Sequence, residues 1–400
     1  MQNKNGRILA LDYFRGLCML AVVINHFIIF ANPLTYLVGA GRLWTGAAEM
    51  FFLLSGMTFA IVRGKNIADM RLVIAKTWKR AAKLYVINFL VVLASLAIAF
   101  WLTARGVGYN IPASLPSDSF VHILRNILTL QYGFGWASFL MYYCLFLLAA
   151  PFALRTLYSR WWPAVPIVSA AAFGLSAWRP VAGNAYFYFL IWQVYFFLGM
   201  SIARFRLEIL AWYRGLRPAV AKVMTYGIVA TAAVTLAVSA LLSFKTQQVL
   251  AKIKDLGWLN AHSGSINHYL QANRAGLARP LVAILVFTAI YIVYQKNWRF
   301  LQARTGNFVN TIGRNSLTVF VAQALTIPLI SALPWPHGNI LLNTALTLYL
   351  LAFMWLVAER SNLFLYVQAS VASLLVSLRN LAYLSITNIK HAGQKIITSS

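Results

Sequence analysis

The sequence predicts an all-α membrane protein, a transmembrane helical bundle of about ten spans with its N- and C-termini in the cytoplasm. Three observations predict this fold class. The 400 residues are 61% hydrophobic and 10% charged, which is more apolar surface than a soluble domain of this length can bury. The apolar residues come in runs of about 20, the length of helix that crosses a ~30 Å hydrocarbon core. The charged residues lie mainly in the short segments between these runs.

Each apolar run is interpreted as one membrane-spanning helix, in which every backbone N–H and C=O group can be satisfied internally. The first run exceeds the ~7–15 residues of a signal-peptide core and contains Arg15, so it is predicted to be a helix and not a cleaved leader. In order, the predicted spans are residues 8–29, 44–62, 84–103, 136–154, 161–178, 185–203, 223–243, 280–295, 316–335 and 340–358.

Lysine and arginine are distributed unevenly between the two sides of this predicted bundle. Of 34 such residues, 24 lie on the side of the N-terminus, nine lie on the other side, and Arg15 lies within a span. Because cytoplasmic loops carry the excess of Lys and Arg, both termini are predicted to be cytoplasmic. A net charge of +27 in a soluble protein would suggest a nucleic-acid partner. Here the placement of the charges excludes nucleic acid and makes membrane lipids the expected partner.

Residues 1–360 are predicted to form one membrane domain and residues 361–400 a C-terminal helix and tail. The stretch 362–389 is apolar but interrupted by polar residues, which favours a helix on the membrane surface and leaves an eleventh span open. Two outer segments, 105–135 and 244–279, are long enough to cover a site that faces outward.

The two cysteines, Cys18 and Cys144, lie within apolar runs. We therefore expect neither a disulfide nor a metal site. The sequence does not specify the oligomeric state.

The ionisable residues at membrane depth are few, and because their burial in lipid is costly they indicate functional positions. Arg15 and His26 are separated by about 20° around the first predicted helix and by roughly 16 Å along it, so they share one face. Asp12 shares this face and can pair with Arg15. His26 and Glu49 of the second helix are predicted at matching depth near the outer surface. Together they would form a base oriented by an acid, as general-base catalysis on a hydroxyl requires. The alternative is a polar contact that only holds two helices together.

Ser55 is six residues from Glu49, about 240° around the helix, and therefore points elsewhere. Its hydroxyl is expected to bond back to its own helix. Gly56 returns to the Glu49 face, where the missing side chain permits close helix packing or leaves room for a ligand.

Two groups of cations on the cytoplasmic side suit the phosphates of a ligand. One precedes the third span, where anionic lipid headgroups explain it equally well, and comprises Lys76, Lys79, Arg80 and Lys83. The other is Arg314 next to the start of the ninth predicted helix, whose free backbone N–H groups form an anion site. N-capping is the expected role of the Asn315 and Ser316 side chains.

Several segments resemble a known family. Residues 11–16, LDYFRG, followed by His26, resemble the first helix of the acyltransferase-3 superfamily, whose hallmark is an arginine, ten residues and a histidine. Residues 47–56, AAEMFFLLSG, are similar to the second-helix motif of its OpgC-like branch of periplasmic glucan succinyltransferases, which fits best. Weaker similarities at 190–199 and 313–317 extend the resemblance over most of the chain.

The resemblance implies an acyl-CoA donor, succinyl-CoA or acetyl-CoA, that enters from the cytoplasm of a bacterium through a multi-pass protein of its inner membrane. It implies a glycan hydroxyl as acceptor on the outer side, His26 as the catalytic base and Arg15 as a contact for the donor. Arg80 and Lys83 take the place of the superfamily's basic pair. Where relatives often carry histidine this chain has Asn88 and Gln323, so the acyl group and the acceptor stay open.

The sequence thus predicts a membrane O-acyltransferase with catalytic and donor-binding residues on the inner helices. The catalytic candidates are His26, Glu49, Arg15 and Asp12, and the donor-binding candidates are Arg15, Arg80, Lys83, Arg314 and Ser316. In the outer segment, Trp258 and Tyr269 are candidates for stacking on sugar rings, and Asn260 and Asn267 for hydrogen bonds. These aromatic residues could equally belong to the headgroup belt.

The main alternative is a transporter or flippase that uses Arg15, His26 and Glu49 as a path for an ion or a substrate. Inverted repeats with paired broken helices would favour it, and the sequence shows neither. An N-acyltransferase of sugar amines would share the donor and differ only in the acceptor.

Overall fold

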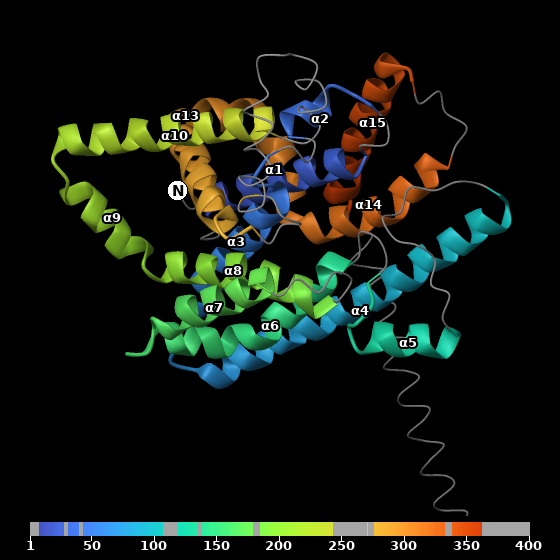
Figure 1. Cartoon of the computed structure of the whole chain (residues 1–400), viewed down its shortest axis with the longest axis horizontal. Helices are drawn as coiled ribbons and strands as arrows, with labels where there is room; N and C mark the ends of the chain where they lie inside the picture. Colours follow the sequence, from blue (N-terminus) through green and yellow to red (C-terminus); the bar gives the residue numbers. More distant parts are fainter. Residues whose placement is uncertain are drawn as a thin grey trace, which may run out of the picture.

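The computed structural model describes residues 8–27, 31–39, 43–106, 119–133, 138–178, 185–242, 270, 276–332 and 338–361. These residues form helices joined by turns, with no strand among them (Figure 1). In chain order the helices are α1 (Leu9–His26), α2 (Leu34–Leu37), α3 (Ala47–Gly64), α4 (Met70–Ala104), α5 (Phe120–Leu128), α6 (Ser138–Leu157), α7 (Ala164–Trp178), α8 (Ala185–Arg204), α9 (Arg206–Gly215), α10 (Pro218–Leu242), α13 (Arg279–Arg314), α14 (Ser316–Ser331) and α15 (Ile340–Glu359).

Each predicted span corresponds to a helix of the structure. Among the described residues, eight helices are long and apolar enough to cross a membrane, namely α1, α3, α4, α6, α8, α10, α13 and α15. α7 and α14 are shorter apolar helices. The prediction of an all-α, multi-pass membrane protein is therefore confirmed.

α4 and α13 are much longer than the spans predicted at 84–103 and 280–295. They have 35 and 36 residues, so each is about 50 Å long and extends well past a bilayer core. The prediction stopped short because hydropathy follows only the apolar part of a helix, whereas backbone hydrogen bonding continues through its charged part. The basic cluster before the third predicted span consequently lies on α4 itself, on a helix whose first turn is capped by Asp69.

Two glycines hold α3 directly against α8. A Cβ atom at Gly56 would overlap the Phe196 carbonyl oxygen, and one at Gly199 would overlap the Leu53 carbonyl oxygen. Of the two roles considered for Gly56, the structure therefore supports close helix packing.

The same device joins α1 to α13. A Cβ atom at Gly16 would overlap the Val309 carbonyl oxygen, and one at Gly313 would overlap the Asp12 carbonyl oxygen. Arg15, which precedes Gly16, is thus carried by a helix whose distance from α13 is set by backbone contact.

The described chain begins and ends at one end of the bundle, which we call the basic end. Asp12 of α1 packs on Gly313 there, and the hydroxyl of Ser361, just after α15, donates to Asn315 Oδ1 over 3.1 Å. This common location agrees with an even number of membrane crossings.

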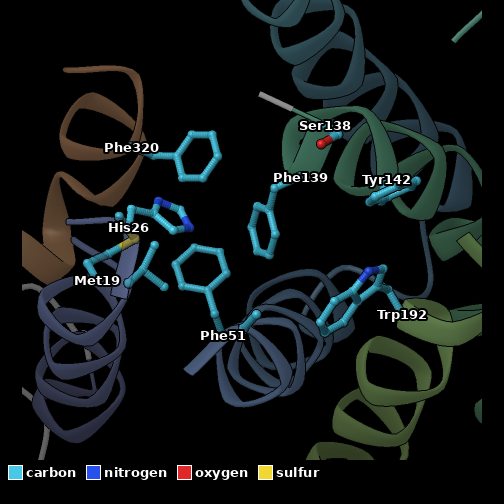
Figure 2. Close-up of a pocket in the computed structure, with 10 residues that line it drawn as sticks. Met19, His26, Phe51, Ser138, Phe139, Tyr142, Trp192 and Phe320 are labelled. Atoms are coloured by element: carbon cyan, nitrogen blue, oxygen red, sulfur yellow. The ribbon is translucent and has the colours of Figure 1, made fainter. Parts of the chain in front are cut away.

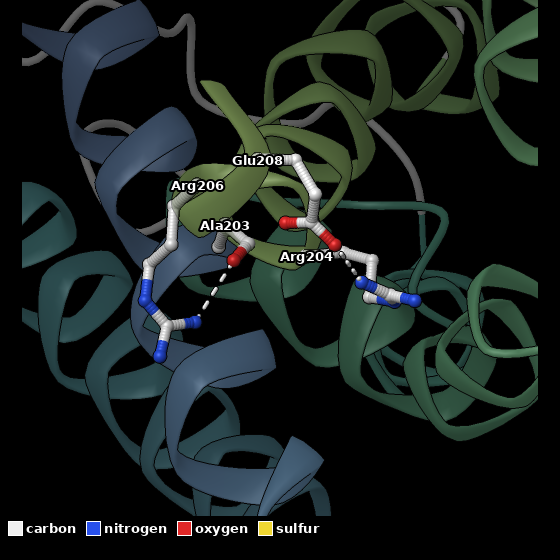
Figure 3. Close-up of polar contacts among 4 residues, drawn as sticks. All are labelled: Ala203, Arg204, Arg206 and Glu208. Carbon is white, nitrogen blue, oxygen red and sulfur yellow. Dashed lines mark hydrogen bonds and ion pairs between the residues drawn. The ribbon is translucent and has the colours of Figure 1, made fainter. Parts of the chain in front are cut away.

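α9 leaves α8 at the basic end and leads to α10 (Figure 1). Figure 3 shows Arg204 donating to Glu208 Oε1 at 2.9 Å and Arg206 donating to the Ala203 carbonyl oxygen at 2.9 Å. A hydrogen bond from its own backbone amide, and then Arg204, hold the pKa of the Glu208 carboxyl below its ordinary value. This exposed pair spans the turn between the two helices.

Candidate functional site

One face of α1 carries Arg15, Met19, Val22 and His26, at intervals of four, three and four residues, which align side chains along a helix. The last three of these side chains line a partly open cavity of about 140 Å³. A cavity of roughly this size can hold a benzene-sized molecule. The structure therefore places His26 in a cavity and Arg15 one turn further toward the basic end.

Aromatic side chains from α3, α6, α8 and α14 form most of the cavity wall. They are Phe51 of α3, Phe139 and Tyr142 of α6, Trp192 of α8 and Phe320 of α14. Figure 2 shows the His26 ring directed into the space between Phe51, Phe139 and Phe320. An apolar wall of this kind lowers the local dielectric and strengthens the electrostatic interactions of the imidazole.

Gln323 of α14 holds His26 in place. The His26 Nδ1 atom lies 3.1 Å from Gln323 Oε1, and Gln323 is 0% exposed. Because an amide oxygen only accepts hydrogen bonds, this contact favours the tautomer in which Nδ1 carries the proton. Nε2 is then the nitrogen that can accept a proton.

Glu49 has a partner that the sequence did not indicate. Arg279 donates from Nε to Glu49 Oε1 at 2.7 Å, and its second nitrogen lies 2.5 Å from the same oxygen. Glu49 is 2% and Arg279 6% exposed, and Arg279 also interacts with Tyr195. Arg279, the last residue of the predicted outer segment 244–279, is the buried first residue of α13. Glu49 thus takes part in a buried ion pair between α3 and α13, and its pairing with His26 stays a prediction.

Arg15 lies where α1, α3 and α14 meet. It donates to Ser316 Oγ at 2.7 Å, and its guanidinium carbon lies 5.6 Å from the centre of the Phe51 ring. Asp12, Tyr143 and Arg80 are within electrostatic range of it. Its Nε atom is buried and has no hydrogen-bond partner. Arg15 is therefore held on one side and has an unused donor on the other.

Two further arginines continue from Arg15 at the basic end. Arg80 of α4 donates to the Tyr143 hydroxyl at 3.1 Å and lies within electrostatic range of both Arg15 and Arg63. Like charges at such range repel each other, and an anion bound between them would relieve the repulsion. We call Arg15, Arg80 and Arg63 the arginine trio.

The other predicted donor contacts lie at the same end. Lys83 and Arg314 are exposed, and Arg314 bonds to the carbonyl oxygen of Asn310 and to Thr311 Oγ1 of its own helix. The expected capping of α14 by its first side chains is wrong. Asn315 makes no capping bond and donates instead to the Thr311 carbonyl oxygen, and the Ser316 hydroxyl binds Arg15.

Ser55 also differs from its expected role. Its hydroxyl is buried, at 2% exposure, and has no hydrogen-bond partner, so the expected bond to its own helix is wrong. The neighbouring Thr58 does make such a bond, to the Leu54 carbonyl oxygen at 2.7 Å. Asn88 likewise has a buried amide without a partner.

The predicted acceptor contacts, Trp258, Asn260, Asn267 and Tyr269, lie outside the described residues, as does the C-terminal segment 362–400. Cys18 and Cys144 are free and buried. Within the part of the chain that the structure describes, no group of three His, Cys, Asp or Glu side chains could hold a metal ion.

Sequence reasoning missed three residues of the site, Arg63, Tyr143 and Arg279, and recognised Gln323 only as a departure from relatives. A signal was available for two of these four residues, Gln323 and Arg279. Gln323 is a polar residue within an apolar run, and Arg279 directly precedes one, and both positions are costly unless a partner is present.

Comparison with known proteins identifies the family of the chain. A family model described as "OpgC protein" matches residues 7–364. Neither the curated proteins nor the solved structures gave a match. Because the matched segment includes every described helix and covers nearly the whole chain, the chain belongs to the OpgC family.

Proposed function

We propose that this protein transfers an acyl group, succinyl or acetyl, from cytoplasmic acyl-CoA to a hydroxyl of an extracytoplasmic glucan or polysaccharide, with His26 as the general base. Membership in the OpgC family indicates a membrane glucan acyltransferase. The observation that carries the finer proposal is the single face of α1 that runs from Arg15, the member of the arginine trio on this helix, along the cavity wall to His26.

In the proposed reaction, His26 Nε2 removes the proton from the acceptor hydroxyl while its oxygen attacks the carbonyl carbon of the thioester. The carbon–sulfur bond breaks, the ester forms, and the proton held by His26 passes to the thiolate, which leaves as coenzyme A. Gln323 supports this role because it binds the other ring nitrogen and keeps Nε2 as the acceptor. The cavity has room for a small acyl group and little more.

The donor is proposed to enter at the basic end, which the excess of Lys and Arg assigns to the cytoplasm. Its phosphates would lie near Arg63 and Arg80, with Lys83 and Arg314 on the same surface. Asp12 and Ser316 hold Arg15 on the path from these cations to the cavity.

Replacing Arg63 and Arg80 together by glutamine is expected to weaken the binding of coenzyme A about 5- to 10-fold at low salt, because each exposed charge contributes up to about 1 kcal/mol. The loss should shrink as salt screens the charges. Titration calorimetry at two salt concentrations measures both effects. Arg214→Gln, an exposed charge on α9, is the matched control. Arg314→Gln tests separately whether Arg314 also contacts the phosphates of the donor. Equal affinities of the double variant and the wild type at low salt would exclude this phosphate site.

The acceptor is proposed to approach from the outer end, where the segment around Trp258 and Tyr269 is predicted to meet it. Replacing both residues by alanine should raise the KM for the glucan and leave the affinity for coenzyme A unchanged, because stacking on sugar rings is lost. A variant with unchanged KM would assign the two aromatic residues to the headgroup belt.

The proposal as a whole is tested with the purified protein, acyl-CoA and a linear glucan, with mass spectrometry of the glucan. Acylation that depends on the protein is the expected result. Mass spectrometry of envelope glycans from cells with and without the protein identifies the natural product. A protein that moves the glycan across vesicles without acylating it would be a transporter instead.

A further inference from the structure

The cavity has a second side, on α3, that continues toward the basic end as the α1 face does. Ala48 and Phe51 line the cavity, and Ser55 follows Phe51 after four residues. The intervals of three and four residues align all three side chains on one face of α3. Ser55 therefore lies one turn beyond the cavity, on the side where Arg15 lies on α1.

Two buried polar groups without a partner occur along this stretch. They are the Ser55 hydroxyl and the Arg15 Nε atom, and the Phe51 ring lies against Arg15 from the cavity side. A buried donor without a partner is costly, and native structures rarely contain one unless another molecule supplies the partner. The neighbouring Thr58 shows that a hydroxyl on α3 can bond to its own helix, which Ser55 does not do.

The position of this pair suits a particular part of the donor. Ser55 is seven residues from Ala48, or roughly 10 Å further from the outer end of α3. In acyl-CoA, the chain that joins the thioester to the phosphates is the pantetheine arm, which is extended and carries two secondary amides. An arm that runs from the arginine trio to the cavity passes Ser55 and Arg15, and its amides need hydrogen-bond partners in such an apolar passage.

We propose that Ser55 is a donor-positioning residue whose hydroxyl, together with Arg15 Nε, binds an amide of the pantetheine arm. This inference rests on the proposed donor. It adds to the phosphate contacts a separate contact that fixes how far the thioester reaches toward His26. Ser55 does not touch the reacting atoms and acts through the placement of the donor.

The experiment compares Ser55→Ala with the wild type for two ligands by titration calorimetry. One ligand is coenzyme A, and the other is adenosine 3′,5′-bisphosphate, which lacks the arm. Loss of one hydrogen bond should weaken the binding of coenzyme A about 2- to 12-fold and leave that of the bisphosphate unchanged. The ligand-free variant should unfold at the same or a higher temperature, because an unpartnered buried hydroxyl has been removed.

The matched control is Ser239→Ala on α10, whose buried hydroxyl bonds to the Leu236 carbonyl oxygen at 2.8 Å. It should lower the unfolding temperature and leave both affinities unchanged. Unchanged affinity of Ser55→Ala for coenzyme A overturns the inference, as does an equal loss for both ligands, which would mean an indirect effect. If the wild type binds neither ligand, the proposed donor itself is wrong, and this outcome is distinct from the other two.

Discussion

Replacement of His26 by alanine is expected to reduce acyl transfer about 10²- to 10⁴-fold, the usual loss when a general base is removed. The reason is that the His26 ring lies in the cavity and, in the proposed reaction, accepts the proton of the attacking hydroxyl. The rate is measured with purified protein, acyl-CoA and glucan at saturating concentrations. Binding of coenzyme A should change little, because the arginine trio and Ser55 are untouched.

Gln323→Leu is the companion variant, because it removes the partner of His26 Nδ1 and keeps the imidazole. A smaller loss of rate, about tenfold, is expected. The imidazole can still accept a proton in this variant, but it loses the hydrogen bond that fixes its orientation. Transfer by His26→Ala at more than about a tenth of the wild-type rate would show that another group is the base.

Glu49→Gln is expected to destabilise the protein by about 3–5 kcal/mol, because it leaves the charge of Arg279 buried without its counter-charge. The double variant Glu49→Leu with Arg279→Met should recover most of the lost stability, since both charges are removed and the volumes are nearly kept. Thermal unfolding of the single and double variants in one detergent measures the coupling between the two residues.

The exposed pair of Arg204 and Glu208 provides the control for this experiment (Figure 3). Glu208→Gln should leave the unfolding temperature unchanged, because an exposed ion pair is screened by water and salt. If the double variant at Glu49 and Arg279 is as unstable as Glu49→Gln, this explanation is wrong. The loss of stability would then not come from the uncompensated charge of Arg279.

The spans were predictable because hydropathy is a local property of the chain. Ten apolar runs correspond to eight long helices and two shorter ones in the structure. The lengths of α4 and α13 were not predictable in this way, because their basic ends are stabilised by helical hydrogen bonds and not by lipid.

Single polar side chains were harder to assign. The period of the helix places Arg15 and His26 on one face, and the structure has them there. The sequence also predicted a hydrogen bond from the Ser55 hydroxyl to its own helix, and this prediction was wrong. The orientation of a hydroxyl depends on the packing of the neighbouring helices, which the local sequence does not specify.

The sequence by itself determined the class of fold, the order of the spans, the common face of Arg15 and His26 and the resemblance to a family, because each depends on residues close together in the chain. Only the tertiary structure decided the partners. Arg279 is 230 residues from Glu49, Gln323 is 297 from His26, and Ser316 is 301 from Arg15. These pairs join α3 to α13 and α1 to α14, and only the packing of helices far apart in the chain brings such polar groups together, because no local pattern specifies which helices become neighbours.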